Sequence, residues 1–236
     1  MILLEELQKG KVFIIDKPLD WTSFDVVNKI RWNIRKTHSL RKFKVGHAGT
    51  LDPKATGVLV ICVGKFTKRI SEFQNEDKTY TGTFKLGVTT ESYDTEQPEN
   101  ETFPTDHITE DLIHQATEQF VGDILQTPPL HSAVKKDGKR LYELARSGSE
   151  YVPEKRPVHI SSFKITKVEM PFVNFEVKCS KGTYIRSLAH DFGRSLNSGA
   201  YLTALRRTQS GEFSIEQADN GPLEKAYFEG SDPSTT

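Results

Sequence analysis

Residues 46–63 read GHAGTLDPKATGVLVICV, a glycine-rich turn region that passes directly into an uninterrupted apolar run. Three glycines in the first part let the backbone turn tightly and approach a ligand closely. The apolar run ends at Val63 and predicts a short buried element. Asp52 followed by Pro53 is typical of a helix start, with Asp as the cap and Pro in the first turn. This stretch therefore predicts a polar loop that leads into the core.

Around this stretch the sequence predicts strands and helices in irregular alternation. Alternating or continuous apolar residues predict strands over residues 11–16, 79–88, 158–168 and 172–179. The sequence predicts a helix that begins near Thr22 or Ser23, a second that begins near Thr109, with Leu112, Ile113, Ala116 and Phe120 at helical spacing, and a third over residues 184–196. Residues 89–106 are polar and punctuated by proline, so we expect a loop. Because no regular βαβ rhythm is present, we predict an α+β fold with a mixed, largely antiparallel sheet.

A length of 236 residues suits one large domain or two small ones. We predict one domain over residues 1–220, with an extended, mobile insertion at 127–157 whose centre, 141–146, has a helical pattern. The remaining residues, 221–236, form a short polar tail that we expect to fray.

Composition excludes several classes of protein. The longest apolar run, Val58–Val63, is too short to cross a bilayer, and Glu5 and Glu6 interrupt any secretory signal at the start. Cys62 and Cys179 lack a second cysteine nearby for a metal or redox motif, so we expect two buried, reduced thiols. A cytoplasmic globular protein is the resulting prediction.

Charged residues are segregated although the formal net charge is zero. Between Asp25 and Glu72 the chain carries eleven Lys and Arg residues and one carboxylate, Asp52. From residue 86 to residue 134 there is no Lys or Arg at all. Such segregation is typical of a polyanion-binding face with an acidic opposite side, although a chance cluster on a solvated helix would look the same. Further basic clusters lie at 135–140 and at Arg206–Arg207.

Asp52 is the residue that the charge pattern singles out. A carboxylate weakens phosphate binding, so its position within a basic stretch suggests a chemical role in addition to capping. Backbone N–H groups and nearby cations keep such a carboxylate ionised at neutral pH, which a nucleophile requires.

Five strings together resemble the TruB family of tRNA pseudouridine synthases, in the family's order from Lys11 to about Ala218. They are GHAGTLDPKATGVL, KPLDWTS, DKTYTGTFKLGVTT, CSKGTYIRSLAHDFG and LRRTQSGEFSI. The resemblance implies a pseudouridine-synthase-like fold and an isomerase that converts the T-loop uridine at position 55 of tRNA to pseudouridine. It also implies that neither a metal nor another cofactor is needed.

The resemblance assigns three catalytic residues. Asp52 matches the family's nucleophile, and Arg186 matches the arginine that pairs with it and keeps it charged. Tyr80 matches the active-site tyrosine, an aromatic platform for a flipped base that could also move a proton. Without the motifs, Tyr80 would be an ordinary core tyrosine and Arg186 an ordinary helix arginine.

Five more residues are expected at the substrate. Tyr184 matches a pocket tyrosine, His47 a residue near the flipped nucleotide, and Leu205 a residue whose backbone reads the uracil edge. Arg206, like the following Arg207, would suit phosphates. Lys17 matches a residue that supports the catalytic loop, although Lys17-Pro18 is equally typical of a strand end.

The expected partner is the T-arm of tRNA, bound by a monomer without an obligate protein partner, with the 127–157 insertion folding over the T-loop. The chain departs from the family pattern at Asp20, where Gly is common, and at Ala48, where Thr is frequent. It also ends too early for the C-terminal PUA domain of many members. Two alternatives remain: an RNA-binding or tRNA-folding factor, and a guide-RNA-dependent subunit of the dyskerin type.

Overall fold

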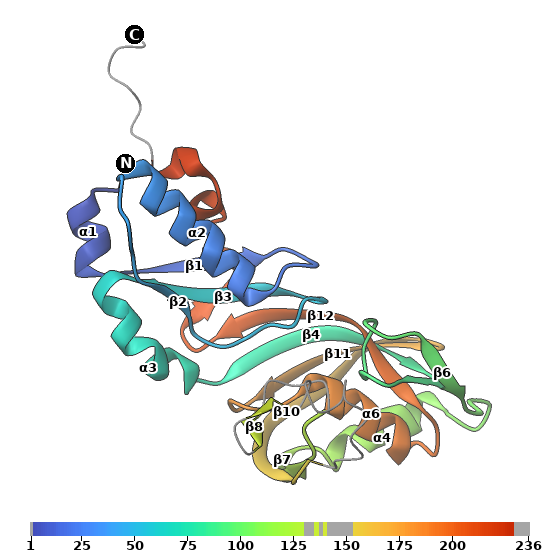
Figure 1. Cartoon of the computed structure of the whole chain (residues 1–236). Helices are drawn as coiled ribbons and strands as arrows, with labels where there is room; N and C mark the ends of the chain where they lie inside the picture. Colours follow the sequence, from blue (N-terminus) through green and yellow to red (C-terminus); the bar gives the residue numbers. More distant parts are fainter. Residues whose placement is uncertain (1, 130–134, 137–138, 141–152, 229–236) are drawn as a thin grey trace. The chain divides into compact units, whose positions relative to one another are not determined.

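The computed structural model describes residues 2–129, 135–136, 139–140 and 153–228, which fall into two compact units. Unit 1 contains the described residues up to Lys78 and those from Arg206 onward, and unit 2 contains Thr79–Leu205. Helices and mainly antiparallel strands occur in both units (Figure 1), which confirms the α+β prediction. The proposed boundary at residue 220 stays a prediction.

Unit 1 is built on strand β3 (Ala55–Val63), whose buried residues form its core. Strand β1 (Lys11–Lys17) runs antiparallel to β3, with Lys17 opposite Gly57, and β2 (Val45–His47) also pairs with β3. The later residues of β12 (Ala200–Ser210) lie next to β3 and pair with β13 (Phe213–Ser214). Shorter helices complete the unit: α1 (Leu4–Lys9), η1 (Gly64–Arg69), α3 (Ile70–Gln74) and η2 (Ile215–Gln217).

Helix α2 (Ser23–Thr37) begins where the sequence predicts. The Thr22 hydroxyl accepts a hydrogen bond from the Asp25 N–H at 3.0 Å, and the Asp25 carboxylate accepts one from the Thr22 N–H at 2.8 Å. This reciprocal cap satisfies donors that the first helical turn leaves open. Apolar residues at helical spacing, Val26, Val27, Ile30 and Ile34, are buried. The opposite face of α2 is basic, as expected.

The expectation of a frayed tail from Gly221 is wrong for its first eight residues. They form the short helices η3 (Gly221–Leu223) and η4 (Lys225–Tyr227), and Phe228 is buried. The Asn33 side chain on α2 donates to the Pro222 carbonyl at 3.0 Å. The rings of Tyr227 and Phe228 meet Phe13 on β1 edge-on. Partners far away in the sequence therefore order this segment, which local composition does not reveal.

Unit 2 surrounds an aromatic core. Its strands run in the order β12, β4 (Lys78–Leu86), β11 (Phe172–Cys179), β10 (Arg156–Glu169) and β7 (Gly122–Gln126). Helices α4 (Glu110–Glu118) and α6 (Ile185–Ser195) complete it. Phe84 stacks on Phe175 with ring centroids 4.1 Å apart, and Phe163 meets Phe84 edge-on. Aromatic pairs of this kind stabilise a core beyond the area they bury.

One expectation in unit 2 needs correction. Residues 89–106 are not a loop throughout, because β5 (Val88–Thr90) and β6 (Glu99–Thr102) pair with each other. All four β6 residues are exposed, so the strand has no apolar alternation that a sequence pattern could detect. The helix predicted after Thr109 is confirmed as α4, on which Ile113 and Ala116 are buried and Leu112 is 42% exposed.

Part of the 127–157 insertion lies outside the described residues, including its predicted helical centre. Within the described part, β8 (Lys135–Lys136) pairs antiparallel with β9 (Lys139–Arg140). No helix in the described ranges is both long and apolar enough to cross a membrane.

Both cysteines are buried and outside any disulfide, as predicted. Burial raises the pKa of the Cys62 thiol to about 11. We therefore expect neither thiol to react with a disulfide reagent such as DTNB at pH 8 in the native protein, because the thiolate is the reactive form. Both should react in guanidinium chloride, which serves as the control. Rapid stoichiometric labelling without denaturant would contradict the structure.

Candidate functional site

Asp52 lies in a loop of unit 1 that joins β2 to β3, here named the aspartate loop (residues 48–54). The Ala55 N–H donates to the Asp52 carbonyl at 3.0 Å, which closes a turn, and β3 begins at Ala55. No helix follows, so the interpretation of Asp52-Pro53 as a helix cap is wrong. The turn leaves Asp52 half-buried at the entry to the central strand.

Ser23 fixes the residue before Asp52. Its hydroxyl accepts from the Leu51 N–H at 2.8 Å and donates to the Leu51 carbonyl at 3.0 Å. Ser23 and Leu51 are each 3% exposed, so both bonds are shielded from water. A buried polar group that loses its partner costs about 1–3 kcal/mol, which makes this attachment firm.

Lys17 holds the residue after Asp52. Its ammonium group is buried and donates to the carbonyls of Pro18, Trp21 and Pro53 at 2.8, 2.5 and 3.3 Å. Three acceptors match the three N–H donors of a charged lysine. Burial lowers the pKa of Lys17 to about 8, and the negative charge of Asp52 opposes that shift.

Asp20 forms a further attachment to the loop. Its backbone has φ +65°, the left-handed region in which Gly is common and Asp is among the better-tolerated alternatives. Its N–H donates to the Pro53 carbonyl at 2.9 Å, and its carboxylate lies 2.7 Å from the Lys54 ammonium. The departure from Gly at this position therefore adds an ion pair to the aspartate loop.

Arg207 does not face phosphates, contrary to expectation. It is 1% exposed, and its guanidinium donates to the carbonyls of Val58 at 2.7 Å and Gly49 at 3.1 Å. A Cβ atom on Gly57 would lie 2.2 Å from the Arg207 carbonyl, so glycine is required for β3 and β12 to approach here. Arg207 thus connects the start of the aspartate loop to β3.

Arg206 and His47 lie on strands that flank this loop. The half-exposed Arg206 guanidinium forms a two-bond pair with the Asp16 carboxylate, at 3.0 and 2.7 Å. His47 ends β2, and burial lowers its pKa, assisted by the positive charge of Arg207. His47 is consequently neutral at pH 7 and can donate or accept one hydrogen bond at each ring nitrogen.

In unit 2, Arg186 lies in the first turn of α6 and is 4% exposed. Its Nη1 donates to the Ser92 carbonyl at 3.2 Å and lies 3.5 Å from Asp94 Oδ2. Asp94 is also buried, and its Oδ1 accepts from the Ser92 hydroxyl at 2.5 Å. The acidic stretch therefore has a structural task, because Asp94 positions this arginine.

Tyr184 is held through its backbone at the start of α6. Its N–H donates to Gln126 Oε1 at 2.7 Å, and its carbonyl accepts from Gln126 Nε2 at 3.1 Å. Gln126 is 2% exposed and ends β7. Tyr80 is buried on β4, and Leu205 is half-buried on the neighbouring β12.

The eight predicted site residues divide evenly between the units. Lys17, His47, Asp52 and Arg206 belong to unit 1, and Tyr80, Tyr184, Arg186 and Leu205 belong to unit 2. Within each unit, the four predicted residues lie on neighbouring elements. The predicted meeting of Asp52 with Tyr80 and Arg186 stays a prediction.

Sequence reasoning did not predict that four residues position the predicted site residues or the loop that carries Asp52: Ser23, Asp94, Gln126 and Arg207. The Thr22-Ser23 pair signalled a helix cap, but the bond from Ser23 to Leu51 spans 28 positions. Asp94 stood in a run of exposed-looking acids, and Gln126 in an unremarkable polar stretch. Arg207 was evident from its place in a basic pair, but that pair suggested phosphate as its partner rather than backbone carbonyls.

Comparison with known proteins identifies the family. The family model "TruB family pseudouridylate synthase (N terminal domain)" matches residues 35–185. "tRNA pseudouridine synthase B" of Flavobacterium johnsoniae is 56% identical over 215 residues, covering 91% of this chain and 94% of the relative. The protein of the same name from Phocaeicola vulgatus is 51% identical over 89% of each chain.

The chain belongs to the TruB family of pseudouridylate synthases. Pseudouridylate synthases are isomerases, so the predicted enzyme class is confirmed. A chain in the crystal structure of a Cbf5-Nop10-Gar1 complex is 33% identical with a TM-score of 0.66, which confirms the predicted pseudouridine-synthase-like fold. The match covers 91% of the TruB-family chain and 52% of that longer chain. Within the described residues, no group of three or more His, Cys, Asp or Glu side chains could hold a metal ion.

The two neighbouring arginines of this TruB-family chain should differ in their effect on stability. Replacing Arg207 with Ala leaves buried carbonyls without donors, and we expect the free energy of unfolding to fall by about 3 kcal/mol or more. Replacing Arg206 with Ala removes a half-exposed ion pair and should cost about 1 kcal/mol or less. Urea unfolding followed by circular dichroism measures both. Equal losses would argue against the anchoring role of Arg207.

Proposed function

We propose that the protein converts the T-loop uridine at position 55 of tRNA to pseudouridine, with Asp52 as the nucleophile. The observation that carries this proposal is the aspartate loop, which holds one carboxylate between two buried attachments, Ser23 to Leu51 and Lys17 to Pro53. Relatives about 50% identical are named tRNA pseudouridine synthase B, which supports tRNA as the substrate.

In the proposed reaction the target nucleotide leaves its stack and enters the site. The N1–C1′ bond breaks, the uracil turns, and a C5–C1′ bond forms, after which the C5 proton is lost and N1 carries a proton. Asp52 assists by attacking either the ribose or the base, or by promoting a glycal intermediate. The atoms of substrate and product are the same, so the reaction needs no oxidant or co-substrate.

The other site residues have proposed roles that suit their environments. Tyr80 provides the aromatic platform and a phenol for proton transfer. Arg186, already oriented by Asp94, pairs with the nucleophile and orients it. Neutral His47 contacts the flipped nucleotide, and Tyr184 and Leu205 line the base pocket. Arg206 binds phosphates through the N–H groups of its guanidinium that remain exposed to solvent.

We propose that a cytoplasmic monomer binds the T-arm directly, with residues 127–157 closing over the T-loop. This distinguishes the chain from the Cbf5 relative, whose structure is that of a complex with Nop10 and Gar1. Pseudouridine formation on a T-arm stem-loop without added protein tests the point. The segregated basic charge also fits a tRNA-folding factor in which catalysis is secondary.

Substitution of Asp52 separates the two functions. For Asp52→Asn we expect the rate to fall by about 10⁴-fold or more, while tRNA binding stays within about threefold, because only the nucleophile is lost. Release of tritium from [5-³H]uridine-labelled tRNA measures turnover, and circular dichroism checks folding. Near-wild-type turnover in both Asp52→Asn and Asp52→Ala would remove Asp52 from its role.

Lys17 predicts a pH dependence. Its pKa is about 8, so the ammonium is present below pH 8 and is lost as the pH rises through that value. A neutral amine has two N–H groups for three carbonyls, so we expect kcat to decline above pH 8 as the loop loosens. Lys17→Met should have a low rate without this alkaline decline, whereas the exposed-site control Lys164→Met should retain it. If Lys17→Met shows the same decline of kcat above pH 8 as the wild type, another titrating group causes that decline.

A further inference from the structure

Unit 1 contains a hollow of about 980 Å³ between α2, the segment before β2 and helix η1, here named the basic pocket. Helix α2 contributes Arg31 and Arg35, η1 contributes Lys65 and Lys68, and three more cations come from segment 41–44. No carboxylate lines this hollow in the part of the chain that the structure describes.

Among the described residues, none provides a counter-ion to the seven cations of the basic pocket. Across the described ranges, no carboxylate lies within 4.0 Å of any of their nitrogen atoms. Where a bond to the protein is formed, it goes to neutral oxygen: Arg31 donates to the Val45 carbonyl at 3.0 Å, and Arg35 to the Leu40 carbonyl at 3.3 Å. Like charges held together without compensation raise the local potential and attract a polyanion.

Exposed aromatic side chains accompany these charges on α2. Phe24 is 57% exposed and Trp32 is 47% exposed, so both rings are accessible to a ligand. The Arg31 guanidinium lies 5.7 Å from the Phe24 ring centre, and Lys29 and Lys36 lie 5.7 and 6.0 Å from that of Trp32. Aromatic rings set among cations stack on bases of single-stranded RNA while the cations bind its phosphates. A small inorganic anion would not use such rings.

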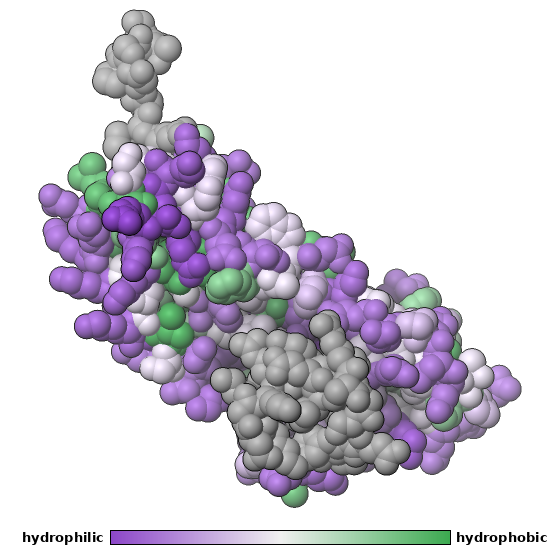
Figure 2. Space-filling view, viewed as in Figure 1, coloured by the Kyte–Doolittle hydropathy of each residue, from purple (hydrophilic) through white to green (hydrophobic). Residues whose placement is uncertain are grey.

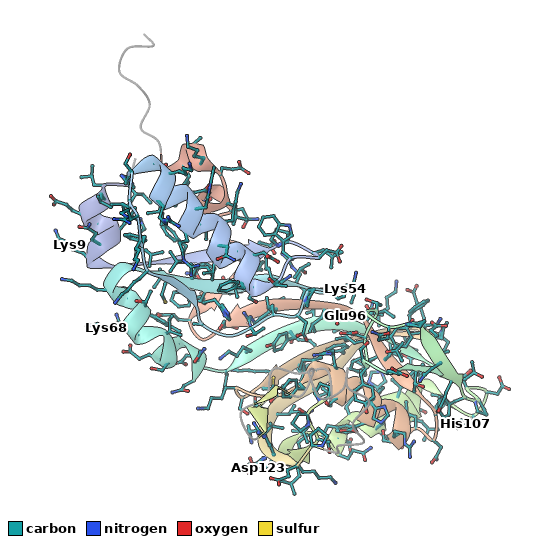
Figure 3. All side chains as sticks on the ribbon, viewed as in Figure 1. Lys9, Lys54, Lys68, Glu96, His107 and Asp123 are labelled. Atoms are coloured by element: carbon teal, nitrogen blue, oxygen red, sulfur yellow. The ribbon has the colours of Figure 1, made fainter. Side chains whose placement is uncertain are left out.

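The basic pocket is separate from the aspartate loop. The loop enters β3 at Ala55, whereas the pocket lies at the other end of that strand, beside Gly64. Nine residues of strand span about 26 Å. Figure 3 shows the same separation within unit 1, with Lys54 and Lys68 labelled at opposite ends. In Figure 2, hydrophilic side chains surround small apolar patches on this unit.

We propose that the basic pocket and the adjoining aromatic face of α2 bind tRNA outside the T-loop, with the cations of the basic pocket on its phosphates and the exposed rings of α2 on its unstacked bases. This inference rests on the proposed function in taking tRNA as the substrate. A separation of about 26 Å from the nucleophile means that one RNA molecule reaches both places only if it extends well beyond the reacting nucleotide. The pocket then contributes affinity and the salt dependence of binding, and leaves the chemical step unchanged.

The test compares two double variants with equal loss of charge. Lys42→Ala with Lys68→Ala removes two pocket cations, and Lys164→Ala with Lys178→Ala removes two exposed lysines from β10 and β11. Dissociation constants for an unmodified tRNA transcript and for an isolated T-arm stem-loop are measured over a range of salt concentrations. Urea unfolding confirms that both variants fold.

We expect the pocket variant to bind tRNA about tenfold more weakly, and the slope of log affinity against log salt to fall by about 1.5 to 2. The pocket variant should lose less affinity for the T-arm stem-loop than for tRNA, and its kcat at saturating tRNA should be unchanged. The control variant should bind tRNA within about twofold of wild type. Trp32→Ala should weaken binding with little change in the salt slope, because stacking releases no counter-ions.

Equal weakening in the pocket and control variants would overturn the inference. A competition experiment provides a second test. If poly-glutamate displaces tRNA as well as an RNA homopolymer of equal charge does, the surface is a general polyanion site and the inference is wrong. The two proposals fail separately. Pocket-dependent tRNA binding without pseudouridine formation contradicts only the proposed function, and pseudouridine formation with pocket-independent binding contradicts only this inference.

Discussion

The buried guanidinium of Arg207 is the interaction on which the aspartate loop depends. Its donors reach carbonyls at the start of the loop and on β3, so the loop and the central strand of unit 1 are joined through one charged group. Burying a cation lowers the stability of the fold unless oxygen atoms of the protein replace the water around it. The carbonyls can do so only while the aspartate loop keeps this conformation. Arginine suits this position because its planar guanidinium donates to several acceptors at once and stays protonated. Gly57 completes the arrangement by allowing β12 to approach.

Around this anchor, buried polar bonds hold the backbone on both sides of the carboxylate. Ser23 binds the residue before Asp52, and Lys17 binds the residue after it. A polar network whose members are all satisfied is rigid, because any displacement leaves a buried donor or acceptor open. Unit 2 also positions its residues through buried polar contacts, since Asp94 forms an ion pair with Arg186 and Gln126 binds the backbone of Tyr184. Preorganised charge of this kind is the main means by which enzymes stabilise reacting groups.

Local patterns predicted much of the fold but little of this support. The β1 strand, the Thr22 cap of α2 and the alternating residues of β4 were evident because their signals are contained within a few neighbouring residues. The β5–β6 pair escaped prediction because all four β6 residues are exposed and polar, and the partners of Glu99, which are Lys85 and Tyr201, lie outside this segment. The order of the segment after Gly221 escaped prediction because its partners, Phe13 on β1 and Asn33 on α2, lie far away in the sequence.

The sequence by itself determined the family, the identity of the lone carboxylate in the basic stretch, and the segregation of charge, since motifs and composition do not depend on folding. Only the tertiary structure decided what each cation does. Arg206 and Arg207 are adjacent in the sequence, yet one forms a half-exposed ion pair and the other is enclosed beneath the aspartate loop. Neighbouring strand residues point to opposite faces, and burial and partners are set by chain segments far away. For the same reason, basic residues scattered from Arg31 to Lys68 become one pocket only when α2 and η1 enclose it.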